Sequence, residues 1–159
     1  MNRIVVLALV VILIGIVAII GGYILGNQLQ GPKGFAIYLS ENDELVISDK
    51  DFIFYNRTSH QIKINGEGID RIKKMELYHK SFVVKLNGRE TYNGSFWSDI
   101  DSMPPSGVAI MDILAVQNGI TDTLRIVPCY PSVSFCKGAD PRDNSEIFDY
   151  FQSIGKLVQ

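Results

Sequence analysis

An uncharged apolar run near the N-terminus constrains this chain more than any other feature. Residues Ile4–Leu25 contain no charged side chain, and only Met1–Arg3 precede them. A helix of about 20 apolar residues spans the ~30 Å hydrocarbon core of a bilayer. We therefore expect residues 4–25 to be a transmembrane anchor in contact with the lipid bilayer, with a short cytoplasmic segment (residues 1–3) before it.

A cleaved secretory signal is the alternative to an anchor. Signals have an apolar core of roughly 7–15 residues followed by a small-residue cleavage site, whereas this run is longer and is followed by Gly26-Asn27-Gln28. Arg3 lies on the short side and Lys33 is the first charge beyond the run, so the positive-inside rule favours a cytoplasmic N-terminus. We expect a single-pass protein of the cell membrane, with a linker over residues 26–34 and an extracytoplasmic domain over residues 35–159.

The charge pattern beyond the apolar run is that of a soluble domain. The chain has 15 Lys and Arg against 17 Asp and Glu, for a net charge of −2. Nucleic-acid surfaces need clustered Lys and Arg, and the close pair Lys73–Lys74 is flanked by Asp70 and Glu76. We expect no nucleic-acid partner, and no cofactor motif is present.

Two cysteines and two sequons bear on the compartment. Cys129 and Cys136 are the only cysteines, and outside the cytosol such a pair usually forms a disulfide. Two buried thiols in adjacent strands are the alternative to a disulfide. A zinc site is disfavoured, because two cysteines without a nearby histidine cannot supply four ligands. Asn56 and Asn93 lie in N-x-[ST] sequons and are glycosylation candidates if the organism modifies asparagine.

The first half of the domain reads as strands with one short helix. Strands are expected at residues 35–39, 45–47 and 51–56, the last buried on both faces, and at 61–64, where apolar and polar residues alternate. Ile69, Ile72 and Met75 have helical spacing over residues 69–76. Residues 82–86 and 89–92 flank Asn87-Gly88, a strong hairpin signal.

The second half predicts further strands and a final helix. Residues 108–116 are expected as one long strand interrupted by Asp112, and Asn118-Gly119 as a hairpin into residues 123–127. Asp143 and Glu146 resemble a capping box, followed by an apolar helical face that extends to Leu157. The predicted fold class is α+β: a mixed or antiparallel sheet with a short central helix and a C-terminal helix. A β-sandwich with a C-terminal helix is the alternative.

The order of elements from Ile62 to about Ile110 resembles a known module. An alternating strand, Gly66-Glu67-Gly68, a short helix and the strand entering Asn87-Gly88-Arg89-Glu90 are similar to the P1-head module of SecD-type protein-export subunits. The resemblance covers under a third of the chain and implies a fold with helices on one face of the sheet. It carries no functional residue with it.

No motif of catalysis or metal binding is apparent. His60 and His79 lack metal-ligand spacing, no G-x-S-x-G elbow is present, and the neighbouring carboxylates Asp99 and Asp101 are typical of a loop. We therefore expect no enzyme, no catalytic residues and no metal ligands.

Two stretches are candidate interaction surfaces. The first contains Phe96 and Trp97, and the second runs from Tyr130 through Asp140 to Arg142; a structural role in the core or as a connector is the alternative for each. We expect a non-catalytic interaction or accessory module of an envelope complex that contacts another membrane or envelope protein. A small-ligand-binding domain and a hydrolase with a spatially assembled site are the alternatives.

Overall fold

The computed structural model describes residues 33–101, 105, 107–130, 133–136 and 138–159. The expected anchor at residues 4–25 lies outside the described residues. Gly34–Gln159 form one compact unit. No helix within the described residues is both long and apolar enough to cross a membrane.

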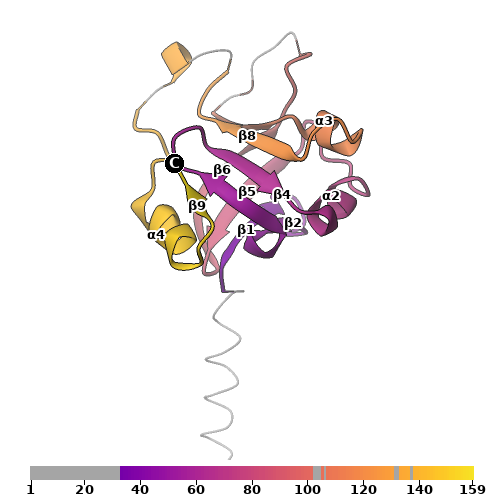
Figure 1. Ribbon diagram of the computed structural model, residues 1–159. Coiled ribbons are helices and arrows are strands. Elements are labelled where there is room, and N and C mark those ends of the chain that lie inside the picture. Colours follow the sequence, from indigo (N-terminus) through magenta and orange to yellow (C-terminus); the bar gives the residue numbers. More distant parts are fainter. Residues whose placement is uncertain (1–32, 102–104, 106, 131–132, 137) are drawn as a thin grey trace, which may run out of the picture. The chain divides into compact units, whose positions relative to one another are not determined.

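The compact unit is built on one mixed sheet that curves into a half-barrel (Figure 1). Among the described residues the sheet has nine strands in the order β2-β1-β5-β6-β7-β8-β4-β3-β9. Their bounds are β1 Phe35–Leu39, β2 Leu45–Ser48, β3 Phe52–Asn56, β4 Gln61–Ile64, β5 Ser81–Leu86, β6 Arg89–Phe96, β7 Val108–Met111, β8 Thr123–Val127 and β9 Leu157–Val158.

Most neighbouring strands of the sheet are antiparallel, and two pairs are parallel. β6 runs parallel to β7, and β3 runs parallel to β9. Asn87 and Gly88 both have positive φ and join β5 to β6 in the predicted hairpin. The mixed α+β class is therefore confirmed, and the described residues form one sheet rather than the two sheets of a sandwich.

Within the described ranges, three short α-helices and two 3-10 turns connect the strands. They are η1 Asp49–Asp51, α2 Gly66–Ile72, α3 Ile113–Gln117, η2 Val133–Phe135 and α4 Ser145–Ser153. Asn65 caps α2 by accepting a hydrogen bond from the Gly68 amide, and Asn144 caps α4 through the Glu146 and Ile147 amides. Side-chain oxygens at these positions satisfy amides that have no partner within the helix.

Aromatic rings join α4 to the sheet. Phe151 of α4 lies 5.0 Å from the ring centroids of both Phe35 and Tyr55, and 5.6 Å from that of Phe52. All four side chains are buried. Buried aromatic pairs add stability beyond the area that they remove from water, so this cluster holds the last helix against the sheet, as the apolar face of residues 147–157 predicts.

Asp112 divides the expected strand at residues 108–116 in two. Its backbone is left-handed (φ 69°), and the chain turns there from β7 into α3. The expected single strand is therefore wrong, because an apolar run of this length suits a buried strand and a buried helix equally well.

The last helix is shorter than its apolar pattern indicates. α4 ends at Ser153, Gly155 follows with positive φ, and Leu157 enters β9 beside Tyr55. The cap is Asn144 rather than Asp143. The expectation that β3 is buried on both faces is also wrong, since Ile53 is 51% exposed.

Candidate functional site

A disulfide between Cys129 and Cys136 confirms the predicted pairing. The two Cα atoms are 5.4 Å apart, and the bond closes a short loop that contains η2. In Figure 1 η2 lies beyond β8, at the opposite end of the domain from the start of β1. Pro128 comes directly before this loop and Pro141 follows it, and fixed proline φ angles further restrict the backbone.

A pocket of about 520 Å³ lies beside this disulfide. We call it the disulfide pocket, and most of its lining is apolar. One wall is formed by Pro105, Gly107 and Val108, and the rest by Pro128, Cys129, Tyr130, Phe135, Cys136, Gly138, Ala139, Asp140 and Pro141. Phe135 is 63% exposed, so a large aromatic ring stands at the pocket with most of its surface in water.

Arg142 fixes one edge of the disulfide pocket to the sheet. Its side chain is buried, and Nη1 donates a 2.6 Å hydrogen bond to the Ile126 carbonyl of β8. Nε and Nη2 donate to the two carboxylate oxygens of Asp140, at 2.9 Å and 2.5 Å. The Arg142 hydrogen bonds lower the pKa of Asp140, which therefore stays ionised. The pair holds the backbone of residues 138–142 in place.

Tyr55 and His60 are two buried rings that lie within range of the positive charge of Arg142. The Tyr55 hydroxyl and His60 Nδ1 are 2.7 Å apart. Burial lowers the pKa of His60, and the positive charge of Arg142 lowers it further, while burial raises the pKa of Tyr55. Both rings are neutral near pH 7, so this pair supports the fold rather than offering a charge to a ligand.

A second cluster surrounds the carboxylate of Asp101. Tyr78 donates its hydroxyl to Oδ1 at 2.5 Å, and His79 Nε2 lies 3.1 Å from the same oxygen. The Tyr78 and His79 rings stack with centroids 3.9 Å apart, and Trp97 lies 4.4 Å from His79. The hydrogen bond from Tyr78 is the main cause of a lowered pKa for Asp101. This arrangement fixes the start of the segment that leads to Pro105.

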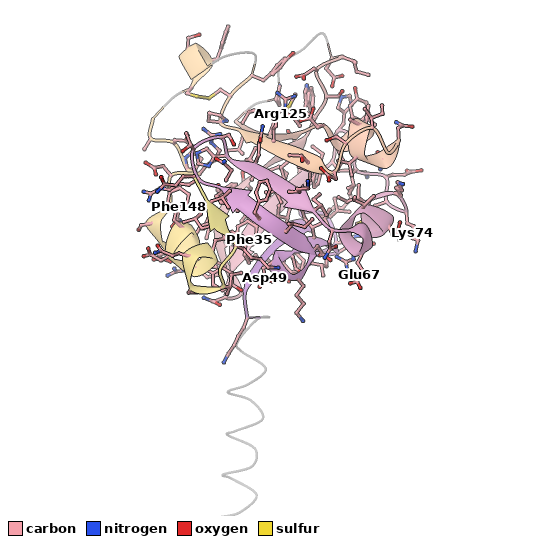
Figure 2. The ribbon with its side chains drawn as sticks, viewed as in Figure 1. Phe35, Asp49, Glu67, Lys74, Arg125 and Phe148 are labelled. Atoms are coloured by element: carbon pink, nitrogen blue, oxygen red, sulfur yellow. A yellow bond between two sulfur atoms is a disulfide. The ribbon has the colours of Figure 1, made fainter. Side chains whose placement is uncertain are left out.

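Arg125, labelled in Figure 2, lies on β8 and links two further carboxylates. It donates to Asp112 through Nε and Nη2, and to Asp99 through Nη2 at 2.7 Å. These hydrogen bonds raise the pKa of Arg125 above its ordinary value. Arg125 thus connects β8 to Asp99 and Asp112, and the carbonyl of its neighbour Ile126 connects the same strand to Arg142.

These clusters lack a complete hydrolytic arrangement within the described part of the chain. His79 has a carboxylate partner in Asp101, whereas His60 is paired with a tyrosine. No serine hydroxyl hydrogen-bonds to either histidine among the residues described. The same residues hold no group of three or more His, Cys, Asp or Glu that could bind a metal ion. The apolar pocket is therefore the better-developed candidate site.

The predicted surface residues occupy different environments. Phe96 is fully buried and packs on Phe82, so it belongs to the core. Trp97 is half-buried against His79, Asp140 lines the disulfide pocket, and Arg142 is buried behind it. Only part of each predicted stretch is thus available for contact.

The two sequon asparagines lie away from the disulfide pocket's lining. Asn56 ends β3, and its side-chain oxygen accepts from the Ser59 amide. Asn93 is exposed on β6.

Sequence reasoning missed the opposite wall of the pocket and the histidine cluster. Pro105 and Val108 are 20 or more positions from the disulfide, and His79 and Asp101 are 22 positions apart. The cysteine pair and the stretch from Tyr130 to Arg142 were the available signal, and they indicated only one wall.

Comparison with known proteins adds no relative: no family model, curated protein or solved structure matches the chain.

Proposed function

We propose that this chain is a membrane-anchored, non-catalytic binding domain, an interaction or accessory module of an envelope complex, whose binding site is the disulfide pocket. One observation carries the proposal: a mostly apolar pocket of about 520 Å³ is bounded by a disulfide and three prolines, with the exposed Phe135 beside it. Large apolar side chains left in water at a rigid cavity are typical of contact sites.

The rigidity of this pocket supports binding in a second way. The Cys129–Cys136 bond and the Arg142 hydrogen bonds hold its walls in the absence of a partner. A preorganised site loses less conformational entropy when it binds. The pocket volume also lies in the ~300–1,000 Å³ range of small-molecule sites, which favours a ligand-binding domain as the second candidate.

The membrane placement rests on residues 4–25 and is tested separately. Expressed in full, the chain should sediment with membranes and stay there through alkaline carbonate extraction, because ~20 apolar residues anchor a helix in the bilayer. Recovery in the soluble fraction would remove the anchor from the proposal. The likeness of residues 62–110 to the P1-head module stays a proposal about fold alone.

The binding site is tested with a defined neutral peptide. The ¹⁵N-labelled full chain in lipid nanodiscs is titrated with N-acetyl-Gly-Pro-Phe-Pro-Gly-amide, and amide shifts should change around Val108, Tyr130 and Phe135. Phe135→Ser should abolish these changes. Ile120→Ser, at another exposed apolar residue, is the matched control and should leave them intact. Absent or evenly scattered shift changes would refute the site.

A further inference from the structure

We infer that His60 and Arg142 form a pH switch at the disulfide pocket: when the His60 ring takes up a proton, residues 138–142 separate from the sheet and one wall of the pocket opens. Residues 138–141 all line the pocket, so their release removes a wall. The inference rests on the proposed function only in taking this pocket as the binding site, and it adds a means of regulation.

Ile126 of β8 connects the two residues of the switch. Its amide donates to the His60 carbonyl at 3.0 Å, and its carbonyl accepts from Arg142 Nη1 at 2.6 Å. His60 and Arg142 are both buried, with 8% and 9% of their surface exposed. The switch therefore lies where water screens charges poorly, and like charges repel more strongly there than at the surface.

A proton on the His60 ring would lack a carboxylate partner. In the described part of the chain, the ring hydrogen-bonds to the Tyr55 hydroxyl, 2.7 Å from Nδ1, and to no carboxylate. Asp140 accepts from Arg142 with both of its oxygens. Burial lowers the pKa of His60, and the charge of Arg142 lowers it further, while Asp140 and Asp143 act in the opposite sense. Protonation thus places a second cation near Arg142.

Aromatic rings enclose His60 on the side of β3 and α4. The ring centroids of Tyr55 and Phe148 lie 6.0 Å and 6.2 Å from that of His60. Burial raises the pKa of Tyr55, and likewise that of Tyr92 on β6, so both hydroxyls are neutral near pH 7. The Arg57 guanidinium lies 4.6 Å from the Phe148 centroid. Among the residues described, those that bring charge toward His60 are therefore Arg57, Asp140, Arg142 and Asp143.

The loop is the side of this contact that gives way. The backbone of His60 is bonded to β8, and the next residue, Gln61, lies in β4. Residues 138, 139 and 141 are exposed, and Arg142 pairs with Asp140 inside the same loop. Release therefore breaks the bond to Ile126 and leaves the ion pair intact. Segments with few buried contacts open at the lowest free energy.

Acid favours the open form. Once the loop has left, Arg142 is removed and water reaches the ring, so the pKa of His60 returns toward its ordinary value of about 6.5. In the closed form, burial and Arg142 hold that pKa lower. The open form binds the proton more readily, and the closed form loses stability as pH falls below about 6.5. One proton changes the ratio of open to closed form by at most about tenfold per pH unit.

Amide hydrogen exchange tests the switch. The ¹⁵N-labelled full chain in phosphatidylcholine nanodiscs is followed without peptide at about pH 7.5 and about pH 5.5, on either side of the ordinary histidine pKa. Each rate is divided by that of an unstructured chain at the same pH. Protection of the Ile126, Arg142 and Asn144 amides should fall about five- to tenfold at the lower pH. The Asn87 amide, which donates to the Gly34 carbonyl, should keep its protection.

Replacing each histidine in turn assigns the response. His60→Asn should abolish the fall in protection, and asparagine suits the left-handed backbone at this position (φ 52°). His79→Asn is the matched control, because His79 is also left-handed (φ 65°) and its side chain is 48% exposed; the fall should remain. In the unmodified chain, the midpoint of the fall should coincide with the titration of the His60 ring signals, which decides the question even if a variant fails to fold.

Each contrary result has a distinct meaning. Protection that falls equally throughout the domain would show global acid unfolding and overturn the switch. Titration of His60 with unchanged protection at Ile126, Arg142 and Asn144 would show that the ring turns outward instead, and would also overturn it.

The neutral Pro-Phe-Pro peptide tests the proposed function separately in the same sample. Shift changes around Phe135 at about pH 7.5, without a pH-dependent loss of protection, would keep the binding site and overturn the switch. The loss of protection without any shift change would support the switch and refute the binding site.

Discussion

Replacing Arg142 tests the connection between the pocket and the sheet. Arg142→Met keeps most of the side-chain volume but removes the hydrogen bond to the Ile126 carbonyl and the three to the Asp140 carboxylate. Removing one partner of a buried ion pair costs about 3–5 kcal/mol. Here Asp140 is 32% exposed and regains water, so we expect a loss of about 2–3 kcal/mol in the free energy of unfolding.

The assay is equilibrium urea unfolding of a fragment of residues 31–159, followed by Trp97 fluorescence. We expect this fragment to be a soluble monomer. A loss of 2–3 kcal/mol corresponds to a fall of roughly 10 °C in Tm for a domain of this size. Arg89→Met is the matched control, since Arg89 forms an exposed ion pair with Glu146, and exposed pairs contribute about 0–1 kcal/mol.

A double-mutant cycle separates the ion pair from the hydrogen bond to the sheet. Asp140→Ala alone leaves Arg142 buried with one partner, and the two changes together should cost less than their sum by about 1 kcal/mol or more. The proposed role of Arg142 in holding the pocket to the sheet would be refuted by either of two results. One is a free energy of unfolding for Arg142→Met within about 0.5 kcal/mol of the unmodified fragment, and the other is a coupling energy of zero between Arg142 and Asp140.

Three further outcomes are expected of the same fragment. In thermal melts, Gly94→Ala should destabilise the fragment by about 3 kcal/mol, because the new Cβ would lie 2.1 Å from the Val108 carbonyl oxygen. Gly66→Ala is the control and should be neutral or stabilising, because the space around Gly66 is open. Cys129 and Cys136 should resist thiol labelling in unreduced, denatured protein, and replacing both with Ser should cost about 2–3 kcal/mol; full labelling would contradict the disulfide. Burial lowers the pKa of His60 below its ordinary 6.5, so the unfolded chain binds the proton more readily and stability should fall as pH drops below about 6.5. His60→Asn should flatten this pH dependence in urea midpoints, and an unchanged slope would assign it to other groups.

Local patterns predicted those elements whose residues carry their own signals. The alternation of Gln61–Ile64 and the Asn87-Gly88 turn gave β4 and the β5–β6 hairpin in their observed places. Such signals work because side-chain periodicity and positive φ are properties of neighbouring residues. The disulfide was likewise predicted from the two cysteines alone, together with the expectation that the domain lies outside the cytosol.

Elements that depend on tertiary pairing were not predictable in this way. Leu157 continues the apolar period of α4, yet Gly155 ends the helix and Leu157 pairs with Tyr55 of β3. Asp112 adopts a left-handed backbone beside Arg125, a partner 13 residues away. The pocket's second wall and the Tyr78–Asp101 contact join segments that no local pattern relates.

The parallel pairing of β9 with β3 has a consequence for how the sheet is completed. Tyr55 and Leu157 are register partners, so about a hundred residues are synthesised between the first strand of this pair and the second. The Lys156 ammonium also donates to the Asp49 and Phe52 carbonyls. Until this segment arrives, one edge of β3 has unpaired backbone groups that another chain could pair with. Long-range pairings of this kind slow folding, so the time between synthesis of β3 and of β9 is the interval in which the nascent domain is most exposed to aggregation.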